Sequence, residues 1–305
     1  MKKIFLLISL FVLIDLACGL SITGTSPTSP APLPTNTALP VIVDPTQIPA
    51  SPTPIPVTLT PIATQTASSG VDAAFWPVSL VLPAGLASGV HGSQIPRVDG
   101  KDLAYWDLTP GHTLLDLEGY RLQGKTHPPQ IYVYPALAYA EMLPGAFESI
   151  HRLDNILYGP GGPSLNADQL PTVPFFNARQ AFASKAELIS FQNGGGVRFL
   201  TEYAQYAVSA NNQDLFYHFE GVSRDGAYYI VAILPISHPK LAETSDAGAT
   251  LPVEGIPYPY FVDPEADMQG YYTDVTALLN AASPDEFTPT IAQLDALIQS
   301  IRITQ

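Results

Sequence analysis

Residues 191–238 constrain the fold of this chain more than any other stretch, because they read as three consecutive β-strands. The stretch is rich in Phe, Tyr, Val and Thr, whose side chains fit a pleated surface. Its apolar runs are separated at Asn211-Asn212 and at Asp225-Gly226, and both pairs are typical of turns. We therefore expect an antiparallel sheet, with a tight hairpin at Asp225-Gly226.

The side-chain pattern of these strands predicts which surfaces they bury. Alternate residues from Val197 onward are mostly apolar on one face, whereas the other face mixes Arg198 and Glu202 with Leu200. We expect the first face to be buried and the second to be mixed. Residues 230–234 are apolar on both faces, which predicts a central strand covered from both sides.

The rest of the chain adds strands and helices around this sheet. We expect further strands at residues 75–83, 113–122 and 131–135, and a Gly-, Ser- and Pro-rich loop over residues 84–111. Helical spacing or capping signals predict helices at residues 145–158, 177–188 and 265–282, and a last one from Thr288-Pro289. A capping box at residues 283–286 precedes the last helix. The expected fold class is α+β, an antiparallel sheet with helices packed on it.

Residues 1–18 have the layout of an export signal, with two lysines, a short apolar run and small residues at its end. The run is too short to cross the roughly 30 Å core of a bilayer as a helix. Cys18 is the only cysteine, and its position resembles the lipidated cysteine of a bacterial lipoprotein lipobox. Asp15 departs from that pattern, so an ordinary signal peptide that discards Cys18 is the alternative.

Residues 19–70 are dominated by Pro, Thr, Ser and Ala, and their only charge is Asp44. Such a composition cannot bury enough apolar area to form a core, so we expect a disordered linker. Its extended length exceeds about 100 Å at about 3.1 Å per residue. A glycosylated stalk and a proline-rich ligand are the alternatives to a plain spacer. Residues 71–305 are then expected to form a single globular domain.

The charge balance limits the partners of that domain. The chain has a net charge of −14, and the charges of the first 70 residues cancel, so the domain carries all of the acidity. Such a surface repels nucleic-acid backbones and anionic lipid headgroups. We therefore expect no nucleic-acid partner, and membrane attachment through a lipid anchor alone.

No sequence motif predicts a catalytic residue, a cofactor or a metal site. The histidines, including His218 in a strand, have no zinc-site spacing, and we interpret His218 as a surface or half-buried structural residue. Four acidic residues mimic a calcium loop, namely Asp263, Glu265, Asp267 and Asp274. Met268 stands where that loop needs Gly, so we prefer to interpret them as the acidic first turn of a helix. Gly194-Gly195-Gly196 lacks the context of a phosphate loop and is interpreted as a turn or a close backbone approach.

Many tyrosines fall on or near the predicted strands and the helix that follows them. They could line a groove for a peptide or a sugar, or pack across strands without any ligand. The set comprises Tyr203, Tyr206, Tyr217, Tyr228, Tyr229, Tyr258, Tyr260, Tyr271 and Tyr272.

Three segments carry a family resemblance: residues 131–135, residues 191–235 with the sequence FQNGGGVRFLT at their start, and residues 287–301. They resemble a family of uncharacterised bacterial lipoproteins. The layout of a strand hairpin followed by a terminal helix is also similar to the Mog1/PsbP-type α+β sandwich. Neither resemblance implies an activity or site residues.

The sequence therefore favours an extracytoplasmic lipoprotein on the outer face of the cytoplasmic membrane or on the cell surface. We expect a binding or interaction module whose ligand is an envelope protein, a peptide or a glycan. The alternative is a cell-envelope hydrolase that uses carboxylate and tyrosine side chains in a cleft.

Overall fold

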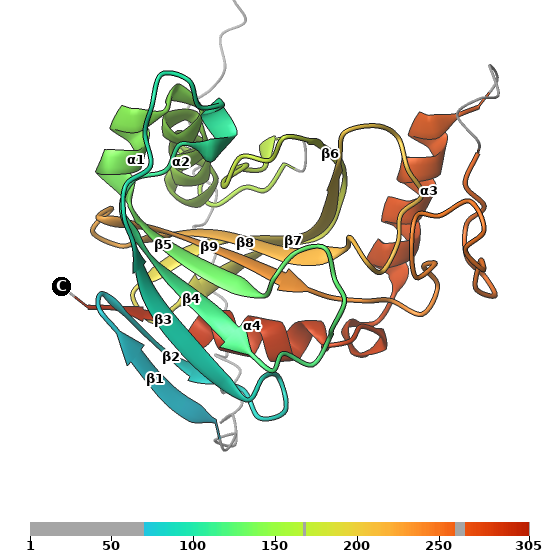
Figure 1. Ribbon diagram of the computed structural model, residues 1–305, viewed down its shortest axis with the longest axis horizontal. Helices are drawn as coiled ribbons and strands as arrows, with labels where there is room; N and C mark the ends of the chain where they lie inside the picture. Colours follow the sequence, from blue (N-terminus) through green and yellow to red (C-terminus); the bar gives the residue numbers. More distant parts are fainter. Residues whose placement is uncertain (1–69, 167–168, 260–265, 305) are drawn as a thin grey trace, which may run out of the picture. The chain divides into compact units, whose positions relative to one another are not determined.

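The computed structural model describes residues 70–166, 169–259 and 266–304, and these residues form an α+β fold with two antiparallel sheets (Figure 1). The strands are β1 (Val71–Phe75), β2 (Val78–Leu82), β3 (Gly89–Ile95), β4 (His112–Glu118), β5 (Gln130–Pro135), β6 (Arg179–Phe191), β7 (Gly194–Ala204), β8 (Phe216–Ser223), β9 (Tyr228–Pro235) and β10 (Arg302–Ile303). The helices are α1 (Ala136–Met142), α2 (Pro144–Tyr158), α3 (Met268–Ala281) and α4 (Ile291–Ser300), with 3₁₀ helices η1 (Tyr105–Asp107) and η3 (Pro284–Glu286).

The larger sheet has seven strands in the order β3-β4-β5-β9-β8-β7-β6, so β9 is its central strand. This arrangement confirms the three strands expected in residues 191–238. The β8–β9 hairpin turns at Asp225-Gly226 as predicted, and Gly226 adopts a φ of 70° that a side chain would disfavour.

Both faces of the larger sheet are covered, as the apolar strand at residues 230–234 predicted (Figure 1). On β9, Val231 and Ile233 pack in the core that includes α1 and α2. Ile230, Ala232 and Leu234 pack in the other core, which includes α3, α4 and β2. Figure 1 shows α1 and α2 on one side of the sheet and α4 on the other.

The predicted helices at residues 145–158, 265–282 and after Pro289 are present as α2, α3 and α4. The capping box forms, with Glu286 Oε2 accepting from the Ser283 N–H, and Thr290 caps α4. The buried side of α2 carries Ala146 and Leu153, whereas the large apolar side chain of Phe147 is 54% exposed.

The predicted helix at residues 177–188 is wrong, because these residues belong to β6. Strand β6 pairs with β7 over its length, but its register shifts between Gln180 and Phe182 and again between Ser184 and Glu187. The helix was predicted because Asn177 and Gln180 have the spacing of a capping box, but Gln180 lies in β6 and pairs with Tyr203 of β7.

The single strand expected at residues 75–83 is two strands, β1 and β2, joined at Trp76-Pro77. They form a small sheet with β10, a strand that the sequence did not predict. The loop expected at residues 84–111 contains β3, an edge strand paired with β4. This strand was not predicted because glycine has a low strand propensity. Gly92 nevertheless fits this position, since a side chain there would overlap the Phe75 ring.

The Gly194-Gly195-Gly196 run is not a turn, since it lies inside β7 and the turn is formed by Gln192 and Asn193. The alternative, a close backbone approach, is confirmed for Gly196. A Cβ on Gly196 would lie 2.6 Å from the Cα of Gly221 on β8 and would also overlap a backbone carbonyl.

The face of β7 that was expected to be mixed is buried, so this expectation was also wrong. Arg198 is 4% exposed and Glu202 is 1% exposed. Arg198 is accommodated because its guanidinium donates to the Lys185 carbonyl and pairs with the carboxylates of Glu187 and Asp295.

Candidate binding pocket

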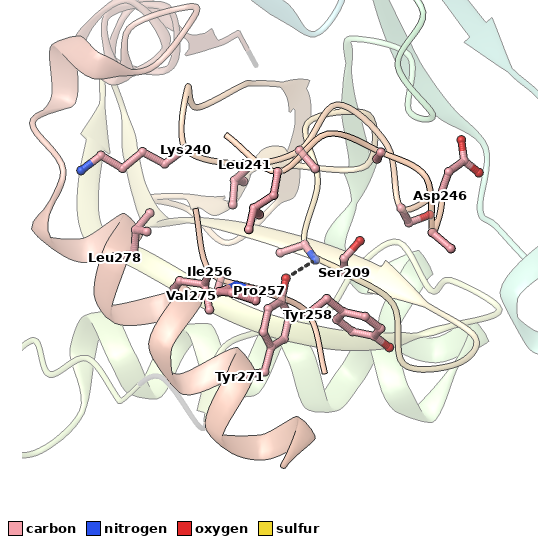
Figure 2. Close-up of a pocket in the computed structure, with 16 residues that line it drawn as sticks. Ser209, Lys240, Leu241, Asp246, Ile256, Pro257, Tyr258, Tyr271, Val275 and Leu278 are labelled. Atoms are coloured by element: carbon pink, nitrogen blue, oxygen red, sulfur yellow. Dashed lines mark hydrogen bonds between the residues drawn. The ribbon is translucent and has the colours of Figure 1, made fainter. Parts of the chain in front are cut away.

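The long connection between β9 and α3 forms a pocket against α3 (Figure 2). The cavity has a volume of about 230 Å³. Its apolar wall consists of Leu241, Leu251, Ile256, Pro257, Val275 and Leu278. A cavity of this size and lining fits a small apolar ligand, or one apolar group of a larger ligand.

Asn212 shapes the start of the connection. Its Nδ2 donates to the carbonyls of His238 and Leu241 at 3.1 Å each, and its Oδ1 accepts from the His238 N–H at 2.8 Å. The Asn212 N–H donates to the Ala242 carbonyl at 2.8 Å. Asn212 is buried, and unpaired amide groups are costly in such surroundings. These bonds therefore fix one wall of the pocket.

Two tyrosines fix the opposite wall by bonding to the chain that follows β7. The Tyr271 hydroxyl accepts from the Ala210 N–H at 2.9 Å, and the Tyr258 hydroxyl donates to the Ala207 carbonyl at 2.7 Å. Their rings meet edge to face, with centroids 5.1 Å apart. Figure 2 marks the Tyr271 bond with a dashed line. Because bonds within the protein hold both walls, ordering them adds little to the cost of ligand binding.

The charged groups of the pocket lie at its edge. Lys240 Nζ forms an ion pair with Glu254 Oε2 at 2.8 Å, and the Asp246 side chain is exposed to solvent. In Figure 2, the Lys240 and Asp246 side chains extend away from the apolar wall. The interior therefore presents apolar groups and neutral hydroxyls, which favours an uncharged ligand group, since burying an unpaired charge is costly.

Glu202 of β7 is buried close to the pocket but is not part of its wall. Its Oε1 accepts from the Asn211 N–H at 2.7 Å. Burial raises the pKa of Glu202 well above its usual value, and the bond from Asn211 offsets only part of that effect. Glu202 therefore supports the chain segment that bonds to Tyr271 and does not itself meet a ligand in the pocket.

A second buried polar cluster lies on the other face of the sheet, against α1 and α2. The Tyr229 hydroxyl donates to Glu220 Oε2 at 2.6 Å, and Glu220 Oε1 accepts from the Val173 N–H at 2.9 Å. His218 Nε2 lies 2.9 Å from the Val173 carbonyl. A carbonyl can only accept, so this bond places the histidine proton on Nε2.

Burial favours the neutral form of both titratable groups of this cluster. It raises the pKa of Glu220 to about 8 and lowers the pKa of His218 to about 3. Their contact at 3.4 Å is therefore an interaction between neutral groups. His218 was expected to be a surface or half-buried structural residue; it is structural but completely buried.

The predicted tyrosine set does not form one groove. Tyr203 and Tyr229 pack with the α1–α2 core, whereas Tyr217 and Tyr228 pack with the other core. Tyr206 is exposed, and Tyr260 lies outside the described residues. Cross-strand packing accounts for the four strand tyrosines. Among the tyrosines of this set that the structure describes, Tyr258 and Tyr271 alone line the pocket.

The acidic residues considered for calcium do not form a metal site in the described part of the chain. Asp267 caps α3, with its Oδ1 accepting from the Gly270 N–H at 2.8 Å, while Asp263 and Glu265 lie outside the described residues. Within residues 70–166, 169–259 and 266–304, no three His, Cys, Asp or Glu side chains lie close enough to hold a metal.

Cys18, the predicted lipidation site, also lies outside the described residues, as do the leader and the linker. In the part of the chain that can be described, no helix has the length and apolar character needed to cross a membrane.

Comparisons with protein-family models, curated proteins and solved structures found no match to this chain.

Proposed function

We propose that this protein is an exported, lipid-anchored binding module of the cell envelope. The export-type leader and Cys18 support anchoring, and the proline-rich residues 19–70 support a domain held away from the membrane. The ligand is an envelope protein, a peptide or a glycan that inserts an uncharged, largely apolar group into the pocket at α3.

The pocket is the observation that carries the binding role. Its walls are largely apolar, its two tyrosine hydroxyls already bond to the backbone, and its charged residues lie at the rim. A preformed apolar cavity with few polar groups is the usual form of a small-ligand site.

Filling the cavity tests this role. Ala249 lines the pocket from the connection, so Ala249→Trp is expected to occupy it, whereas Ala277 is exposed on α3 outside the pocket and Ala277→Trp is the matched control. The probe is N-phenyl-1-naphthylamine, a neutral apolar fluorophore, titrated into the purified chain. Ala249→Trp should weaken probe binding at least ten-fold and Ala277→Trp should leave it unchanged. Equal binding by all three chains would refute the assignment of the pocket.

The anchor is tested separately. Cys18→Ala should abolish labelling with radioactive palmitate and release the protein from the membrane fraction, whereas Ser21→Ala should change neither. Unchanged labelling of the Cys18→Ala chain would show that Cys18 does not carry a lipid.

A cell-envelope hydrolase is the second candidate. The observation that favours it is that a carboxylate, Asp246, and a tyrosine, Tyr258, line the same pocket. Turnover in a broad hydrolase screen that Asp246→Asn abolishes would select this alternative.

A further inference from the structure

The two edge strands of the seven-stranded sheet, β6 and β3, are protected to different degrees. Strand β6 carries two register shifts, and the Asn280 side chain of α3 accepts from the Lys185 N–H. Irregularities and neighbouring elements of this kind prevent an edge from pairing with another strand. Strand β3 has no such protection in its own residues, because its seven positions keep one continuous register with β4 and include no proline and no lysine.

The outer side of β3 is a row of backbone donors and acceptors that no other strand uses. In the described part of the chain, β3 pairs with β4 alone, and no backbone hydrogen bond joins residues 89–95 to any other segment. None of these seven residues is fully buried. The groups that face away from β4 therefore match the backbone of one more extended strand.

Two glycines of β3 let side chains of neighbouring strands reach toward this edge, one on each face. A Cβ on Gly89 would lie 3.6 Å from Glu118 Oε2, so the Glu118 carboxylate extends to the space beside Gly89. A Cβ on Gly92 would overlap the Phe75 ring, which occupies that position from β1. Gly89 and Gly92 are three residues apart and therefore lie on opposite faces of the strand. An added strand would meet a carboxylate on one face and an aromatic ring on the other.

The charge at this edge favours a partner with basic side chains. Glu118 is exposed and forms no ion pair with any described residue. The chain as a whole has a net charge of −14, which attracts cationic segments and repels acidic ones. A second copy of this chain carries the same negative charge, so it matches the edge less well than a basic partner does.

Apolar surface lies beside the same edge. Figure 1 shows β1 next to β3, and the partly buried Phe75 of β1 packs against the core below Gly92. Gln94 Nε2 of β3 donates to the Trp76 carbonyl at 3.0 Å, which holds Trp76 near the strand. The Trp76 side chain is 63% exposed, and large exposed aromatic side chains are enriched where proteins bind one another.

We propose that the outer edge of β3 binds an extended, basic segment of a partner protein, which adds to the sheet as one more antiparallel strand. The segment carries a Lys or Arg side chain opposite Gly89, where it pairs with Glu118, and an apolar side chain opposite Gly92, where it meets Phe75. Backbone hydrogen bonds supply the affinity of such a complex, and the alternate side chains supply its specificity. The edge shares no residue with the pocket at α3, so the two surfaces act independently.

A charge swap tests this pairing on the purified full-length chain. The probe is the peptide TTTVTTK, whose Val and Lys fall opposite Gly92 and Gly89 when its first residue lies opposite Ile95. In titration calorimetry, Glu118→Lys should weaken binding of this peptide about five-fold, and the peptide TTTVTTE should bind Glu118→Lys better than it binds the wild type. Glu141→Lys, a charge reversal at an exposed position on α1, is the matched control and should change neither affinity. No binding of TTTVTTK, or equal effects of the two substitutions, would overturn the proposal.

Backbone methylation of the peptide tests whether it binds as a strand. In an added antiparallel strand, the N–H groups of alternate residues point toward β3 and the others point to solvent. Methylating either the odd-numbered or the even-numbered N–H groups of TTTVTTK should therefore give one peptide that binds and one that does not. Hydrogen–deuterium exchange should show that TTTVTTK protects residues 89–95 and leaves residues 238–258 of the pocket at α3 unchanged. Loss of binding by both methylated peptides, or protection of the pocket instead of β3, would overturn the proposal.

Discussion

The Tyr229 hydroxyl donates a 2.6 Å hydrogen bond to Glu220 Oε2, and neither side chain is exposed to solvent. Glu220 therefore sits inside the sheet as a carboxyl whose protonated form is favoured, because burial raises its pKa to about 8. This arrangement makes the stability of the fold depend on pH.

Glu220→Gln should remove that dependence. The folded state keeps a proton on Glu220 that the unfolded chain releases above its ordinary pKa of about 4.5. The stabilisation is complete below about pH 4.5 and is lost as the pH rises through about 8, with a slope of up to about 1.4 kcal/mol per pH unit. Urea unfolding of both chains between pH 4.5 and 9 should show the wild type losing stability relative to Glu220→Gln. Exposed Glu118→Gln is the control, and parallel curves for wild type and Glu220→Gln would contradict the assignment.

His218 makes the stability of the fold depend on pH in the opposite direction. Burial lowers its pKa to about 3 from an ordinary 6.5, so the neutral form is favoured in the folded state. Its stabilisation is complete above about pH 6.5 and is lost as the pH falls toward 3. We expect His218→Gln, measured by urea unfolding, to reduce the loss of stability between pH 6.5 and pH 3. If His218→Gln and the wild type lose the same stability between pH 6.5 and pH 3, other groups cause that loss. The exposed His151 provides the control substitution.

Gly196→Ala should be strongly destabilising, because its Cβ would lie 2.6 Å from the Gly221 Cα on the neighbouring strand. Backbone atoms cannot move aside as a flexible side chain can, so we expect a loss of about 3 kcal/mol. The adjacent Gly195 is the matched control, since the nearest atom to its Cβ is 3.8 Å away. Thermal unfolding should place Gly195→Ala within about 1 kcal/mol of the wild type. If both variants lose a similar amount of stability, the strand conformation, and not the contact with Gly221, explains why glycine occupies these positions.

Asn212→Ala should loosen the wall of the pocket at α3. The substitution leaves the buried carbonyls of His238 and Leu241 and the His238 N–H without the partners that Asn212 supplies, at a cost of about 3 kcal/mol. Amide exchange over residues 238–243 should accelerate more than exchange in β9. The exposed Asn155→Ala is expected within about 0.5 kcal/mol of the wild type. Uniform acceleration across the whole domain would show that Asn212 has no local role.

Asp295→Ala should weaken the attachment of α4 to the sheet. Asp295 Oδ1 accepts from the buried Tyr217 hydroxyl at 2.8 Å and lies 3.4 Å from Arg198 Nε. Its removal leaves Tyr217 unpaired and the buried guanidinium less compensated, which should reduce the free energy of unfolding by about 2–3 kcal/mol. Asp295→Asn keeps an acceptor and should cost less, as chemical denaturation can measure. Equal costs for Ala and Asn would indicate that only the charge matters.

The sequence predicted the elements whose signals are local. The apolar run at residues 230–234 became the central strand, Asp225-Gly226 became the turn beside it, and the capping box at Ser283 precedes α4. In each case residues within a few positions of one another determine the conformation, so periodicity and turn chemistry were sufficient.

The sequence misled where the tertiary structure alters a local pattern. Asn177 and Gln180 have the spacing of a helix cap, but the residues that follow form β6 and are held in the strand conformation by pairing with β7. Likewise, β3 has a poor strand composition but is held by β4 on one side and by the fit of Gly92 against Phe75. Long-range pairing outweighs intrinsic propensity in both cases.

The sequence by itself determined the acidic character of the domain, the α+β class and the leader-like pattern ending at Cys18, because composition and short-range order encode them. Only the tertiary structure decided that Arg198, Glu202 and Glu220 are buried and that a pocket exists at α3. The pocket depends on contacts such as the one between Ala210 and Tyr271, which lie 61 positions apart. No local pattern specifies such a contact, because it forms only when the sheet and α3 pack together.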